Sequence, residues 1–179
     1  TLVFDYGGTA SLIKARFFLA RRASDISQME SIVGAESGIP AHAVYGSHQG
    51  EDAARVFETI GFSSLNIHTV AAKFNNPFMH VTHFDVMLKE AITLQEVETR
   101  FRKNRLTAVT YRSTNNEVFA EGRDWGHFGR ILNQTVVFLP SLQVLEDGYE
   151  VCGDLFTPQD GNSILSSVAA TLWFRDPEH

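Results

Sequence analysis

The clearest pattern in the chain is an alternation of apolar and polar residues that runs from residue 78 to residue 88. Neighbouring side chains on a β-strand point to opposite faces, so this pattern places His80 and His83 on opposite faces. A polar group in an apolar strand costs free energy unless it is hydrogen-bonded, so two imidazoles here predict a site as well as a core. Because metal ligands must converge on one point, the opposite directions argue against a metal site shared by the two histidines.

The same patterning predicts the other elements. Helices are expected at 51–60, 93–104 and 163–173, and strands at 13–20, 65–74, 106–111, 134–139, 142–145 and 149–155. The first helix should bury Ala54, Val56, Phe57 and Ile60, and the second should bury Leu94, Val97 and Phe101. Turn signals at 75–77 and 147–148 favour antiparallel hairpins. We therefore expect one α+β domain over residues 1–179, a largely antiparallel sheet with helices packed on one face.

Two polar segments between these elements carry candidate anion-binding groups. Arg21 and Arg22 follow the first predicted strand, where they form either a solvated rim or an anion site, because the planar guanidinium suits phosphate and carboxylate. Residues 26–50 form a long predicted loop that ends in Gly-Ser-His-Gln-Gly, with Ser47, His48 and Gln49 directly before a helix. Glycines let the backbone approach a ligand, and a helix N-terminus attracts anions.

Composition narrows the functional classes. The chain has 179 residues and a net charge of −6, which argues against a nucleic-acid-binding protein. No apolar stretch is long enough for a membrane span, and no signal peptide is recognisable. Cys152 is the single cysteine, so no intramolecular disulfide is possible, which fits a cytoplasmic location.

The order of these segments resembles the catalytic domain of the archaeal-type phosphorylating glyceraldehyde-3-phosphate dehydrogenases. Arg-Arg-Ala-Ser-Asp (21–25), Gly-Ser-His-Gln-Gly (46–50) and Phe-Met-His (78–80) match segments that look like Arg-Arg-Gly-Ala-Asp, Ser-His-His-Gly and Leu-Met-His in that family. Gly129-Arg130 and the hairpin at 142–149 are also similar. The resemblance covers roughly residues 13–173, and its weight comes from the order of the motifs.

The resemblance implies a function and a set of roles. Arg21 and Arg22 would face the nicotinamide cofactor (NAD or NADP) or a phosphate. Ser47, His48 and Gln49 would bind the phosphate of the substrate. His80 would be the catalytic base. The substrates would be glyceraldehyde 3-phosphate and inorganic phosphate, in glycolysis or gluconeogenesis, and the product an acyl phosphate formed through a cysteine thioester. A cytoplasmic homo-oligomer, a tetramer in that family, is also implied.

The departures from the family pattern leave alternatives open. The segment with the nucleophilic cysteine and the Rossmann half would precede residue 1, so we expect a fragment that is inactive as an isolated chain. Gln49 stands where the family has a second histidine, and Cys152 lies in a different position from the nucleophile. A related semialdehyde dehydrogenase domain is therefore an alternative, as is a non-catalytic module for oligomerisation or anion binding.

Overall fold

The computed structural model describes residues 8–22, 48–59, 61–62, 65–74, 78–124, 134–158 and 164–176. The helices within this part are α1 (His48–Thr59), α2 (Leu94–Lys103), α3 (Asn115–Asp124) and α5 (Ile164–Arg175), with short 3-10 turns η1 (Thr9–Ser11) and η2 (Glu146–Gly148). The strands are β1 (Leu12–Arg21), β2 (Ile67–Lys73), β3 (Met79–Leu88), β4 (Thr107–Thr110), β5 (Thr135–Leu145) and β6 (Glu150–Pro158).

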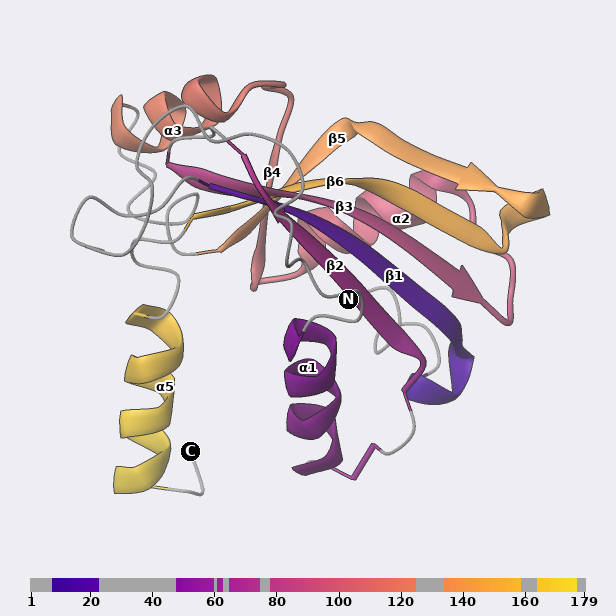
Figure 1. Cartoon of the computed structure of the whole chain (residues 1–179), viewed down its shortest axis with the longest axis horizontal. Helices are drawn as coiled ribbons and strands as arrows, with labels where there is room; N and C mark the ends of the chain where they lie inside the picture. Colours follow the sequence, from indigo (N-terminus) through magenta and orange to yellow (C-terminus); the bar gives the residue numbers. More distant parts are fainter. Residues whose placement is uncertain are drawn as a thin grey trace.

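The strands form one mixed sheet of six strands in the order β2-β1-β3-β6-β5-β4 (Figure 1). The pairs β1–β3, β3–β6 and β5–β6 are antiparallel, whereas β1–β2 and β4–β5 are parallel. The prediction of an α+β fold with a mostly antiparallel sheet is confirmed. The turn signal at 75–77 predicted that the strands before and after it, β2 and β3, pair as a hairpin. This prediction is wrong, because β1 lies between β2 and β3 in the sheet.

Helices cover both faces of this sheet, which corrects the prediction that they pack on one face. Val97 and Phe101 of α2 pack with Phe84, whose face of β3 is opposite to that of Met79. Val118 of α3 packs with Met79 in a second apolar cluster. The core is therefore split into two clusters, one on each face of the sheet.

Helix α2 begins where its capping residues predict, but α1 and α2 bury fewer apolar residues than expected. Thr93 and Glu96 form the predicted capping box of α2, in which the Glu96 N–H donates to Thr93 Oγ1 and the Thr93 N–H donates to Glu96 Oε2. Leu94 is 41% exposed and Val56 is 63% exposed, so their predicted burial is wrong. Helix α1 begins at His48, three residues before the predicted start, so His48, Gln49 and Gly50 belong to a helix.

Strand β5 joins two predicted strands into one. Pro140 interrupts the pattern because it has no N–H to donate to a ladder, and the register shifts between Phe138 and Gln143. Ser141 provides side-chain hydrogen bonds where the β5–β6 ladder is interrupted. Its Oγ donates to Phe138 O and accepts a hydrogen bond from the Asp154 N–H at 2.8 Å. The predicted tight connection at 147–148 is confirmed as η2, which joins β5 to β6.

Candidate functional site

Three of the residues that the sequence singles out meet at one end of the sheet: Arg21, Arg22 and His80. The backbone N–H of Arg22, just after β1, donates to Nδ1 of His80 on β3 at 2.9 Å. Ala20 pairs with Val81, so the antiparallel register places Arg21 opposite His80 on the same face. Two segments that are 58 residues apart in the sequence are therefore in direct contact through Arg22 and His80.

Burial and the nearby charges set the protonation of the His80 ring. Burial, together with the smaller effect of the positive charges of Arg21 and Arg22, lowers the pKa of His80 to about 4. The ring is therefore neutral at pH 7. Because Nδ1 accepts the Arg22 N–H, the single ring proton must be on Nε2.

A neutral ring in this tautomer is a hydrogen-bond donor. Its Nδ1 lone pair is used by Arg22, and its Nε2 carries a proton, so neither nitrogen has a lone pair ready to accept a proton. His80 can stabilise negative charge on a thiolate, a carbonyl oxygen or a phosphate. The role of His80 as a base remains a prediction, and it requires that the Arg22 contact opens first.

The predicted phosphate loop is only partly within the described residues. Ser47 and the side chain of His48 lie outside them. Gln49 lies in the first turn of α1, which is fixed to the sheet by the Gly50 N–H donating to Thr69 Oγ1 at 3.0 Å. Its Oε1 is buried and has no hydrogen-bond partner among the described residues.

The structure does not bring Gln49 next to His80. Thr69, which holds the start of α1, pairs with Phe17 of β1. Phe17 and Arg21 lie on the same face of the sheet, but they are separated by about 13 Å along the strand. The two candidate regions are therefore neighbours on one face rather than parts of one contact cluster.

Thr157 is a polar neighbour of His80 that sequence reasoning did not identify. It pairs with His80 across the antiparallel β3–β6 ladder, so both side chains lie on the same face. The predicted last strand ended at residue 155, three residues before the end of β6. Only the pairing of β3 with β6 reveals the relationship, and no local signal in the sequence specifies that pairing.

His83 lies on the opposite face from His80, as the alternation predicted. Its Nδ1 lies 3.0 Å from the Asp154 carboxylate, and both side chains are about half-exposed. Within the described part of the chain, no group of three His, Cys, Asp or Glu side chains is arranged to hold a metal ion.

Cys152 also lies on the face opposite His80, because it pairs with Asp85. Burial raises the pKa of the Cys152 thiol, and the negative charges of Asp85, Glu150 and Asp154 raise it further. A thiol in these surroundings is a poor nucleophile. Its position and its environment both agree with the expectation that Cys152 does not replace the nucleophile of the dehydrogenase family.

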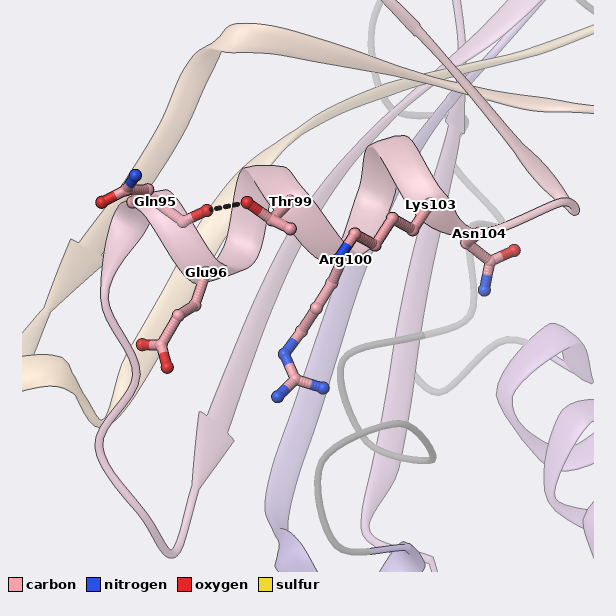
Figure 2. A pocket seen from close by; sticks show the side chains of 6 residues that line it. All are labelled: Gln95, Glu96, Thr99, Arg100, Lys103 and Asn104. Carbon is pink, nitrogen blue, oxygen red and sulfur yellow. Dashed lines mark hydrogen bonds between the residues drawn. The ribbon is translucent and has the colours of Figure 1, made fainter.

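A separate pocket of about 490 Å³ runs along α2. Figure 2 shows that Glu96 and Arg100 extend from the same side of this helix. The lining residues are Gln95, Glu96, Thr99, Arg100, Lys103 and Asn104. Glu96 is occupied in the capping box, where hydrogen bonds from Thr93 lower its pKa. None of the predicted site residues lines this pocket, so we place the candidate functional site at His80.

Comparison with known proteins adds no relative: no protein-family model matches the chain, and no curated protein matches it. None of the described helices is long and apolar enough to cross a membrane.

Proposed function

We propose that this chain is the catalytic-domain portion of an NAD(P)-dependent phosphorylating aldehyde dehydrogenase. The reaction is the oxidation of glyceraldehyde 3-phosphate to an acyl phosphate. One observation carries the proposal: Arg21, Arg22 and His80, which the sequence resemblance identifies together, form one cluster held by the 2.9 Å contact between Arg22 and His80. Residues selected for a shared role are expected to meet in space, and these three do.

The cluster suits a reaction in which negative charge develops on oxygen. The aldehyde carbon accepts a cysteine thiolate supplied from outside this chain, and its carbonyl oxygen becomes an oxyanion. The Nε2–H of His80 is the group that can donate to that oxyanion. Loss of a hydride from that carbon, which an oxidised nicotinamide would accept, would then give a thioester. Phosphate would attack the thioester carbonyl, form the acyl phosphate and release the thiolate.

The cofactor is expected to be NAD or NADP, held mainly by a preceding nucleotide-binding half. Arg21 ends β1 and is exposed, so its guanidinium can contact a phosphate of the cofactor or substrate. When bound, the oxidised nicotinamide takes up the hydride. At this end of the sheet, Arg21 and Arg22 contribute positive charge, and the neutral His80 ring contributes one hydrogen-bond donor.

Helix α5 supports the proposal that the chain functions within a larger assembly. It stands apart from the sheet in Figure 1. Val168, Leu172, Trp173 and Phe174 are 51–77% exposed. Exposed apolar groups of this size mark interaction surfaces, which a second copy or a further part of the same protein can cover. We propose a homo-oligomer, and the mass of a single chain in light scattering of the full-length protein would contradict this.

Two alternatives follow from particular residues. A semialdehyde dehydrogenase domain would share the His80 cluster and differ in the groups that bind the rest of the substrate. A non-catalytic module for oligomerisation or anion binding is favoured by Gln49, which replaces a histidine of the family motif.

The proposed function is tested by assaying the full-length protein with glyceraldehyde 3-phosphate, NAD or NADP, and inorganic phosphate. We expect reduction of the cofactor that depends on phosphate. Equal or higher turnover with an unphosphorylated semialdehyde would favour the first alternative. No turnover with any aldehyde would favour the non-catalytic module.

A further inference from the structure

Thr157 occupies the position that completes a row of hydrogen-bond donors across three strands. The row contains Arg21 on β1, His80 on β3 and Thr157 on β6. Side chains directly opposite each other in an antiparallel pair have their Cβ atoms about 5 Å apart. The Thr157 hydroxyl and the His80 ring are therefore within reach of one small ligand.

The chemistry of this row favours an anion. Arg21 is a permanent cation, the neutral His80 ring donates through Nε2, and a threonine hydroxyl can donate to an oxygen. No carboxylate occupies the row, and the adjacent register position on β2 is Lys73. An anion with several oxygens, such as a phosphate group, can accept hydrogen bonds from all three side chains.

We propose that Thr157 is the third donor of an anion site formed with Arg21 and His80, and that the ligand is a phosphate group. The identification of the anion as phosphate rests on the proposed function, in which a phosphorylated aldehyde and inorganic phosphate are both substrates. The geometry of the donors does not depend on it. Thr157 thereby contributes to ligand affinity from a strand that the sequence motifs do not include.

The proposal is tested by titrating inorganic phosphate into the 179-residue chain at constant ionic strength. Binding is followed through the imidazole nitrogen resonances of His80. In the wild type, the Nε2 resonance should shift and saturate. Thr157→Val keeps the shape of the side chain but removes the hydroxyl, and we expect it to weaken phosphate binding by about tenfold, the effect of one hydrogen bond to a charged group.

Two matched variants separate a direct contact from a structural effect. Thr157→Ser restores the hydroxyl and should bind phosphate within about twofold of the wild type. Thr99→Val makes the same chemical change on the exposed surface of α2, outside this row of side chains, and should leave the affinity unchanged.

The results test two parts of the proposal separately: the role of the Thr157 hydroxyl and the existence of the anion site. An unchanged affinity in Thr157→Val, or a loss that Thr157→Ser does not restore, would overturn the role of the hydroxyl. Absence of any His80 response to phosphate in the wild type would overturn the anion site itself. Neither result would show that the proposed function is wrong, because turnover of the full-length protein with glyceraldehyde 3-phosphate is measured separately.

Discussion

Replacement of His80 by alanine in the full-length protein should lower kcat/KM for glyceraldehyde 3-phosphate by about 10²–10³-fold, the usual effect of removing one oxyanion donor. The structure predicts more than this loss, because the ring uses its two nitrogens differently. Nδ1 accepts the Arg22 N–H, and Nε2 carries the proton that is presented to the ligand. Substitutions that preserve one of these functions should therefore have unequal effects.

Glutamine and asparagine are the informative replacements. A glutamine side chain can place an N–H near the position of Nε2, whereas an asparagine can place an acceptor oxygen near the position of Nδ1. We expect His80→Gln to retain more activity than His80→Asn, because the donor is the group that touches the substrate. The reverse order would show that the Arg22 contact matters more than the donor. Equal losses in both variants, like that in His80→Ala, would favour a base.

Substitution of Gly148 by alanine should destabilise the fold by about 3 kcal/mol, because a left-handed conformation and a steric overlap add together. Gly148 has φ of +101° in the turn between β5 and β6. An added Cβ would lie 2.9 Å from the Ala91 Cβ and 3.2 Å from Ile92 O. The carbonyl oxygen of Gly148 also accepts a hydrogen bond from the Ile92 N–H. The turn therefore cannot move away from Ile92 without losing that hydrogen bond.

Gly61→Ala is the matched control for this prediction. Gly61 also has a positive φ, +86°, but an added Cβ would meet no atom within 4 Å. We expect it to cost only about 1 kcal/mol, the cost of the left-handed conformation alone. Thermal unfolding of both variants measures the difference. Equal destabilisation would mean that the packing of the turn against residues 91–92 contributes nothing.

Local patterns in the sequence predicted most of the elements, but they missed helix α3 and did not predict how the strands are arranged. The alternation of β3 and the capping box of α2 depend on neighbouring residues, and both were correct. The pairing of β2 with β1 was missed, because a short turn such as 75–77 favours a hairpin and nothing local indicates that β1 would intervene. The burial of Val56 and Leu94 was overestimated for a related reason: an apolar stripe does not reveal how far a helix packs against its sheet.

The candidate site was likewise predicted only in part from the sequence. Arg21, Arg22 and His80 could be selected from the sequence because ordered motifs point to them. The structure places Arg22 in contact with His80, and the β1–β3 register places Arg21 opposite it. Thr157 could not be selected, since its relation to His80 depends on the register between β3 and β6. The protonation of His80 was also beyond the sequence, because it follows from one backbone hydrogen bond and from burial.

The central claim is that burial, the two arginine charges and the Arg22 contact hold His80 as a neutral Nε2–H donor, and an NMR titration of its ring nitrogens tests this directly. We expect the proton on Nε2 at neutral pH and a pKa of about 4. The unfolded chain binds this proton at higher pH, near 6.5, so the contribution of His80 to stability should be lost as the pH falls from about 6.5 to about 4. A pKa near 6.5, or a neutral ring with its proton on Nδ1, would contradict the account.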